Sequence, residues 1–508
     1  MSEYSKNKRI AINTISLYFR MLLIMVVTLY TSRVILDVLG VEDYGIYNVV
    51  GGIVVFLSFL NSALNTATQR YMNYEMGKKN IQGIQDVFSS SLILYGIISI
   101  VFIILAETVG LWFVNTILVI PESKIVAAHW VYQCSIISFV INLLSVPYNA
   151  SIIAHEKMTI YAYISVFEVV LKLVLVCLLK YIDLDKLILY SILMSCVQVL
   201  VFFVYRFFCL RNFLYCRFVF VWNKTLMTRL FSFSGWMLSG TITNLLSTQG
   251  VNILINVFFG PVLNASRGIA MQVYGAVSSF VVNFMTAVRP QICKSYAEED
   301  YCYMYKLVFS SSRLSFYLIF ILSLPILLNT HYILSIWLTD VPEYTTLFTQ
   351  LVLIDLLMTA SYSAIAYVSQ ASGKIKYYQI VISISFLLIA GLTWAAYRYG
   401  FPVETTFVIA IIIDFIGLFA RIIVLNKTVG FPIKEYLQKV YLPICIVIAA
   451  ALFLAGLPQL VIDIKTIPLL LLNVIWIIAI TGLFIWFFGL DKREKQLIIN
   501  GIHRITRH

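Results

Sequence analysis

The stretch VLGVEDYGIYNVVGG, residues 38–52, interrupts a chain that is otherwise almost continuously apolar. Among its four glycines, Gly40 and Gly45 enclose the acidic residues Glu42 and Asp43. Glycine permits the backbone conformations that tight turns need. Long apolar runs lie on both sides of the stretch. The sequence therefore predicts a hairpin here that joins two long apolar helices.

The composition places the whole chain in a membrane. Of its 508 residues, 61% are hydrophobic and 12% are charged, and the mean hydropathy is +0.92. A soluble protein has about twice that share of charged residues. Apolar runs of about 20 residues, enough to cross the hydrocarbon core of a bilayer, recur from end to end. The chain is predicted to be an all-α polytopic membrane protein.

About fourteen transmembrane helices are expected, joined by short connections. The predicted spans are residues 11–38, 44–68, 84–114, 124–152, 158–180, 186–208, 231–258, 266–290, 305–337, 344–370, 376–397, 404–424, 438–457 and 466–489.

The basic residues predict the orientation of these spans. With the N-terminus in the cytoplasm, 26 of the 36 lysines and arginines fall on the cytoplasmic side, six fall outside and four lie within spans. Cytoplasmic loops of membrane proteins carry such an excess. Both termini are therefore predicted to be cytoplasmic. The net charge of +12 is explained by this topology and indicates no nucleic-acid partner.

The second half of the chain resembles the first. The sequence NILINVFFG ends the seventh span and RGIAMQVYG opens the eighth, against RVILDVLG and YGIYNVVGG for the first two spans. Transporters are often built from such internal repeats, with the cargo between them. The predicted organisation is an N-lobe of spans 1–6 (1–210), a cytoplasmic linker (211–230), a C-lobe of spans 7–12 (231–430), and spans 13–14 with a basic cytoplasmic tail (431–508).

A family resemblance rests on the same residues. The sequence LGVEDYGIYNVVGGIVVFLSFLNSALNTATQRYMNYEMGK resembles the signature that polysaccharide-biosynthesis flippases carry in spans 1 and 2. Gly40, Tyr44, Gly45 and Tyr47 match its LG-x-x-x-Y/F-G-x-Y pattern, and GPVLNASRGIAM is similar to a degenerate second copy. These flippases belong to the multidrug/oligosaccharidyl-lipid/polysaccharide exporter superfamily.

The resemblance implies a function and a place in the cell. The fold would be that of the multidrug-extrusion transporters, with two six-helix lobes related by a pseudo-two-fold axis. The protein would flip a polyprenyl-diphosphate-linked oligosaccharide, such as an O-antigen, capsule or exopolysaccharide repeat unit, across the bacterial cytoplasmic (inner) membrane by alternating access. Its partners would be this glycolipid, membrane lipid and possible glycan polymerase or assembly proteins, and it would act as a monomer.

Two other functions fit the same fold. A cation-coupled multidrug exporter would favour acidic residues along spans 1 and 7, where this chain has a mid-depth arginine and no acid in span 7. The two additional spans resemble the arrangement in the peptidoglycan-precursor flippase. The sequence contains no nucleophile elbow, phosphate-binding glycine loop or metal-ligand cluster, so we expect no catalytic residues, metal or cofactor.

Arginines inside or near the spans are candidates for binding the diphosphate, because a guanidinium donates paired hydrogen bonds and stays charged. Arg20 lies about ten residues into span 1, where it either lines the cargo cavity or extends to the inner headgroups. Arg267, Arg289 and Arg313 are the second-half candidates. Headgroup contact is an equal alternative for Arg289 and Arg313.

Polar stripes are candidates for binding sugar hydroxyls. They recur at helical spacing in spans 2, 4 and 7, and such stripes also hold membrane helices together by hydrogen bonds. The candidate residues are Asn61, Asn65, Gln69, Asn142, Asn244, Thr248 and Asn252.

Charged residues within the spans are candidates for a gate or for ion coupling, since intramembrane charges are costly. Arg33 and Asp37, and likewise Glu168 and Lys172, are four residues apart and can pair along one helix. Two further acids, Asp355 and Asp414, have no evident partner in the sequence.

Overall fold

The computed structural model describes residues 3–496 apart from 57, 58, 117, 119, 183, 221, 339, 456–465 and 493. For residues 3–8, 29, 32, 33, 36, 41, 42, 48, 52–56 and 59 it describes the backbone alone. The chain divides into two compact units, Met1–Leu238 and Ser239–His508, and each unit is described by itself.

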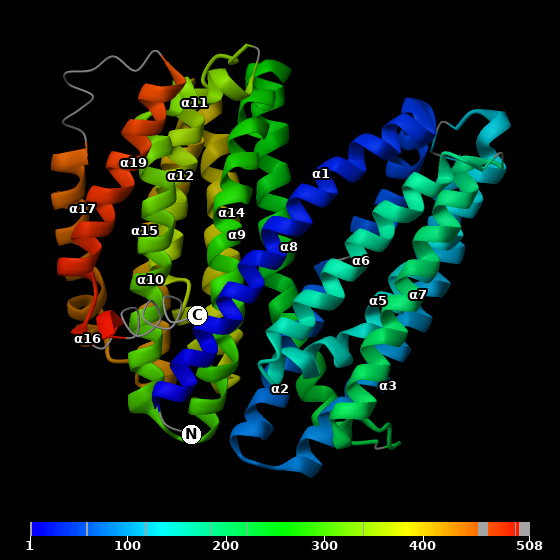
Figure 1. The fold of residues 1–508 in the computed structure, drawn as a ribbon, viewed down its shortest axis with the longest axis horizontal. Helices are drawn as coiled ribbons and strands as arrows, with labels where there is room; N and C mark the ends of the chain where they lie inside the picture. Colours follow the sequence, from blue (N-terminus) through cyan, green and yellow to red (C-terminus); the bar gives the residue numbers. More distant parts are fainter. Residues whose placement is uncertain are drawn as a thin grey trace. The chain divides into compact units, whose positions relative to one another are not determined.

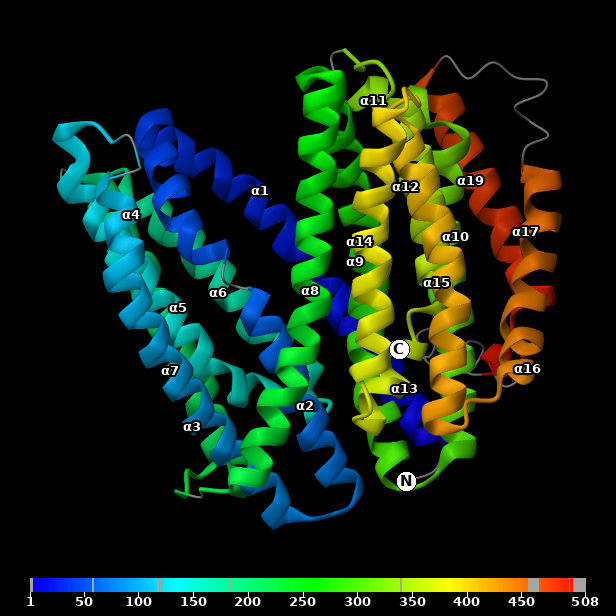
Figure 2. The same cartoon turned by 180° about the vertical axis from the view of Figure 1, so that it is seen from behind.

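The first unit is a bundle of long helices (Figures 1 and 2). Its helices are α1 (Glu3–Phe56), α2 (Phe59–Gly77), α3 (Ile81–Leu105), the short α4 (Leu111–Thr116), α5 (Ile125–Ala154), α6 (Met158–Leu179), α7 (Lys186–Asn212) and the start of α8 (Lys224–Phe259). The helix α5 lies at the centre of the bundle and contacts α1, α2, α3, α6 and α7. It therefore supplies residues to every cavity described below in this unit.

The predicted hairpin at residues 38–52 is tighter than the sequence indicates. Helical geometry continues on both sides of Gly40, which alone departs from it, with φ 78° and ψ 170°. The chain turns back there, as Figures 1 and 2 show for the blue helix α1. Only glycine readily adopts this conformation. Asp43, just beyond the turn, is paired with Lys124 at the start of α5, with 2.8 Å between Nζ and Oδ1.

The second unit repeats this backbone feature. Gly260 separates α8 from α9 with φ 86° and ψ 179°, close to the values at Gly40. Both glycines occupy the positions at which the sequence comparison of the two halves places them. The repeat is thus present in backbone conformation as well as in sequence.

The remaining helices of the second unit are α9 (Pro261–Ala297), α10 (Tyr301–Leu328), α11 (Thr330–Trp337), α12 (Thr345–Tyr362), α13 (Ile365–Ser372), α14 (Lys376–Arg398), α15 (Thr405–Val429), α16 (Ile433–Tyr436), α17 (Leu442–Ala455) and α19 (Ile467–Phe484). Helix α9 packs against α10, α12 and α13, and α14 packs against α15. Large apolar side chains such as Phe348 and Phe407 form the core between these helices.

The last two long helices, α17 and α19, pack against each other, and α19 also packs along α10. Each is continuous with a π-helical turn, Leu437–Tyr441 before α17 and Ile485–Gly489 after α19. Gly489 allows a close approach to α10, because a Cβ atom there would lie 2.9 Å from the ring of Tyr317. This end of α19 is therefore closely packed on α10.

The predicted fold class is confirmed. In the described part of the chain, thirteen helices are long and apolar enough to cross a membrane. They correspond to thirteen of the fourteen predicted spans. The exception is 44–68, which falls on the end of α1, the start of α2 and the two residues between them that lie outside the described part.

Candidate functional site

The first unit contains two adjoining polar cavities. The larger, of about 530 Å³, has Arg20 in its wall together with residues of α2, α5, α6 and α7, and we call it the Arg20 chamber. The smaller, of about 380 Å³, has four serines among its lining residues, and we call it the serine chamber. Asn61, Asn142 and Gln198 line both chambers. These three amides therefore mark the boundary at which the two chambers meet.

Arg20 is held in the wall by Tyr161 of α6. Its guanidinium carbon lies 4.5 Å from the centre of the tyrosine ring, and its Nη2 donates a hydrogen bond of 3.2 Å to the tyrosine hydroxyl. Its Nε is buried and has no hydrogen-bond partner among the described residues. Arg20 thus retains a donor for a ligand in the chamber.

Amide side chains also form part of the wall of the Arg20 chamber. Asn61, Asn65, Asn142 and Asn149 all line it. The carbonyl oxygens of Asn61 and Asn149 are buried and accept no hydrogen bond from the described residues. Buried polar atoms are rarely left unpaired. The carbonyl oxygens of Asn61 and Asn149 are therefore available to accept hydrogen bonds from a ligand or from water.

Glu168, the acidic residue in the described lining of the Arg20 chamber, already has partners. Glu168 Oε1 lies 2.6 Å from Nζ of Lys172, one helical turn away, and accepts a 3.1 Å hydrogen bond from Nε2 of Gln198. Both side chains of the ion pair are about a quarter exposed, 23% for Glu168 and 29% for Lys172. The pair contributes no net charge to the cavities.

The second unit has a cavity of its own, of about 440 Å³. It is lined by residues of α8, α9, α12, α14 and α15, among them Asn244, Thr248, Arg267, Asp355 and Asp414. Thr248 donates a hydrogen bond of 3.1 Å to Asn244, so these two stripe residues bond each other. Arg267 is 7% exposed and donates to the amide oxygen of Asn252.

Arg421 partners one of the two acids in this cavity. Its Nη2 lies 3.3 Å from Oδ1 of Asp414, and its guanidinium carbon lies 4.8 Å from the ring centre of Tyr362. Oδ1 of Asp355 is buried and has no hydrogen-bond partner in the described part of the chain. Two arginines and two aspartates thus line this cavity.

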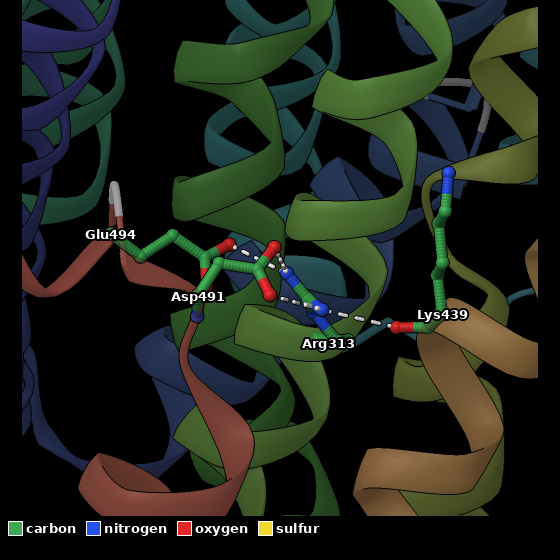
Figure 3. Close-up of polar contacts among 4 residues, drawn as sticks. All are labelled: Arg313, Lys439, Asp491 and Glu494. Atoms are coloured by element: carbon green, nitrogen blue, oxygen red, sulfur yellow. Dashed lines mark hydrogen bonds and ion pairs between the residues drawn. The ribbon is translucent and has the colours of Figure 1, made fainter.

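Arg313 lies in a different environment (Figure 3). This side chain of α10 is 5% exposed and forms ion pairs with Asp491 and Glu494, which follow α19, at 2.7 and 2.9 Å. It also donates a 3.1 Å hydrogen bond to the carbonyl oxygen of Lys439, whose own side chain points away in Figure 3. The guanidinium is thus used inside the second unit, and we leave Arg313 out of the cargo site proposed below.

The other predicted residues are placed as follows. Arg289 lies 5.6 Å from the ring centre of Tyr367, and Gln69 donates a 2.8 Å hydrogen bond to Asn65. Asp37 is exposed. The side chain of Arg33 lies outside the described part, so its predicted pairing with Asp37 stays a prediction.

Sequence reasoning overlooked three contributors to these sites. Tyr161 and Gln198 carried no pattern that set them apart in apolar helices. The charge distribution counts Arg421 among the 26 cytoplasmic lysines and arginines, because it lies near the end of the predicted span 404–424. A signal for it existed, since Asp414 and Arg421 are seven residues, or about two helical turns, apart and share a helix face.

Solved structures similar to this chain are transporters. A MATE protein in complex with MaD3S matches with a TM-score of 0.72, 14% identity, and coverage of 83% of this chain and 97% of that one. An outward-facing multidrug resistance MATE family transporter of the MOP superfamily matches with a TM-score of 0.66, 14% identity, and coverage of 82% and 96%. A MOP superfamily transporter from Pyrococcus furiosus, described as having a binding pocket of reverse polarity, matches with a TM-score of 0.65, 14% identity and the same coverage. No curated protein matches the sequence.

The fold therefore defines a multi-pass membrane protein of the MATE-like class. Within that class the chain belongs to the polysaccharide biosynthesis protein family, whose sequence model matches residues 7–296, more than half of the chain. Its fold is similar to that of solved transporters of the MOP superfamily. The resemblance stated from the hairpin motif is confirmed.

Proposed function

We propose that this transporter is a flippase for a polyprenyl-diphosphate-linked oligosaccharide in a bacterial cytoplasmic membrane. The polyprenyl tail stays in the lipid while the diphosphate and sugars cross the membrane by alternating access. Both termini lie in the cytoplasm, as the distribution of lysines and arginines predicts.

The observation that carries this proposal is the lining of the Arg20 chamber. Four asparagines, one glutamine and two tyrosines, Tyr161 and Tyr205, line this cavity, and Arg20 is the one cation among the described residues of its lining. Amides both donate and accept hydrogen bonds, as sugar hydroxyls do. A guanidinium binds phosphate oxygens through charge-assisted hydrogen bonds. The cavity chemistry thus suits a glycan attached to a phosphate group.

The same cavities argue against a cationic cargo. In the first unit Glu168 is held by Lys172 and Gln198, and in the second unit Asp414 is held by Arg421. To pair with Glu168 or Asp414, a lipophilic cation would have to displace one of these partners. Asp355, whose Oδ1 has no partner among the described residues, we assign to ion coupling together with Asp414.

The experiment that tests the function is a lipid-linked glycan analysis after deletion of the gene in its native host. We expect polyprenyl-diphosphate oligosaccharide to accumulate on the inner leaflet while the surface glycan disappears. If the accumulated lipid is the peptidoglycan precursor, the alternative flippase function holds. Unchanged surface glycan together with increased sensitivity to cationic compounds would instead identify a drug exporter.

A further inference from the structure

We propose that the serine chamber is a binding subsite for one uncharged sugar residue of the cargo, separate from the place where the diphosphate is held. The chamber lies beyond the amide boundary as seen from Arg20, because Arg20 lines only the other cavity. This inference rests on the proposed function. It adds which part of the cargo each chamber receives.

The charge around the serine chamber excludes ionic ligands. Its lining contains one ionisable cation, Lys172, whose Nζ lies 2.6 Å from Glu168. The described lining has no acidic residue that could hold a cation. A diphosphate would find no cation without a partner there, and burying a charge without one is costly. The ligand of this chamber is therefore uncharged.

The hydroxyl groups of the chamber are arranged as acceptors. Ser135, Ser138, Ser191 and Ser195 each donate a hydrogen bond to a backbone carbonyl group at 2.7 or 2.8 Å. Their hydrogens are thus used within the protein. Ser138 Oγ and Ser195 Oγ also lie 3.0 Å apart, so one of these two hydroxyls accepts from the other. The remaining oxygen lone pairs are left to accept from a ligand. A ligand that brings many hydroxyl donors, as a sugar does, matches this pattern. An apolar ligand would leave these acceptor positions unused.

An aromatic pair completes the wall. Tyr47 of α1 and Tyr190 of α7 meet edge to face, with ring centres 4.7 Å apart, and both line the chamber. Aromatic rings offer an apolar surface to the carbon-bound hydrogens of a sugar ring, and Tyr adds a polar hydroxyl. The volume of about 380 Å³ lies within the range of about 300–1,000 Å³ typical of small-molecule pockets.

The amide boundary gives the subsite its specificity. Asn142 donates a 2.8 Å hydrogen bond to the carbonyl oxygen of Ser138, so its orientation is fixed, and it lines both chambers. Asn61, which also lines both, has a buried carbonyl oxygen without a partner in the described residues. We therefore assign Asn61 and Asn142 to the contact with the sugar at the junction.

The test uses the full-length protein in lipid nanodiscs and saturation-transfer NMR with methyl glycosides of glucose, galactose, mannose, rhamnose, N-acetylglucosamine and N-acetylgalactosamine. We expect at least one glycoside to bind, inorganic pyrophosphate not to displace it, and Asn142→Leu to weaken binding about tenfold or more. Asn212→Leu is the matched control. Asn212 also donates to the carbonyl oxygen four residues before it, at 2.9 Å, but lies at the end of α7 and lines neither chamber.

A second variant distinguishes a loss of sugar binding from a loss of folding. Ser138→Ala removes one hydroxyl group with little change in volume and should weaken the same glycoside several-fold without lowering the melting temperature. The inference is overturned if no glycoside binds, if pyrophosphate competes with the bound glycoside, or if Asn142→Leu and Ser138→Ala bind like the wild type. Failure of the proposed function is distinguished by the gene-deletion analysis. If the deletion strain accumulates glycolipid but the protein binds no glycoside, the sugar subsite is refuted and the proposed function is not.

Discussion

Arg313 and Asp491 are 178 residues apart in the chain, yet Nη2 of the arginine lies 2.7 Å from Oδ2 of the aspartate. Glu494 lies 2.9 Å from the same nitrogen, so one buried guanidinium joins α10 to the segment that follows α19 (Figure 3). The C-terminal helices α17 and α19 are thereby fixed to the rest of the second unit by charge as well as by apolar packing.

Arg313→Met should destabilise the protein by about 3 kcal/mol, near the low end of the range for breaking a buried ion pair. The reason is that Glu494, whose side chain is 12% exposed, keeps its charge without its partner. The measurement is thermal unfolding in detergent. Lys439→Ala is the control and should change stability by less than about 0.5 kcal/mol, because its pair with Glu435 is 57–58% exposed. Equal losses in the two variants would contradict this assignment.

Gly40→Ala and Gly260→Ala should each cost about 1–3 kcal/mol, because alanine rarely adopts a φ of +78° or +86°. Gly45→Ala is the matched control. Gly45 is helical, and an added Cβ there has no atom within 4 Å, so this variant should be neutral or slightly stabilising. Unfolding temperatures of the three variants test the expectation, which fails if Gly45→Ala is the most destabilised.

Arg20→Ala should abolish transport while leaving expression intact, and Arg20→Lys should restore only part of it, because a point charge does not reproduce the guanidinium fork. Tyr161→Phe keeps the ring contact and loses only the 3.2 Å hydrogen bond, so most activity should remain. Surface glycan restored to the deletion strain is the measure. Arg211→Ala, at an exposed position at the end of α7, is the control. Normal surface glycan with Arg20→Ala would refute the role of Arg20.

Asp414→Asn should destabilise the second unit by about 3 kcal/mol, because it leaves the buried Arg421 without its carboxylate. The double variant with Arg421→Gln should recover at least half of that loss. A double-mutant cycle of unfolding free energies measures the coupling. The same cycle on the exposed pair Glu435 and Lys439 should give about 0.5 kcal/mol or less. Additive effects at Asp414 and Arg421 would show that their contact is energetically unimportant.

The sequence predicted the helices and the repeat because both are local features. Apolar runs of membrane-spanning length fixed the elements, and the glycines ending spans 1 and 7 marked the two equivalent turns. The pairs formed across the fold were not predictable in this way. Lys124 lies 81 residues from Asp43, and Arg313 lies 178 residues from Asp491, so no periodicity in the sequence links the partners.

In the candidate site, too, the sequence predicted features along one helix but not the contacts between helices. Asn61 and Asn65 lie one turn apart on a polar stripe, and the structure places both in the wall of the Arg20 chamber. That Tyr161 supports Arg20, or that Gln198 holds Glu168, depends on how α6 and α7 pack against their neighbours. Helix periodicity indicates which face is polar but not which residue of another helix meets it.

The two π-helical turns of the C-terminal helices have a consequence for the rotational register of this region. In each turn the closing hydrogen bond spans five residues, from Leu490 N to Ile485 O and from Leu442 N to Leu437 O. A π-turn contains one residue more than an α-helical turn, and one residue corresponds to about 100° of rotation. Deleting a single residue from Ile485–Gly489 would therefore rotate Asp491 about a quarter turn away from Arg313. The ion pair between Arg313 and Asp491 therefore depends on the additional residue of the π-turn as well as on the carboxylate itself.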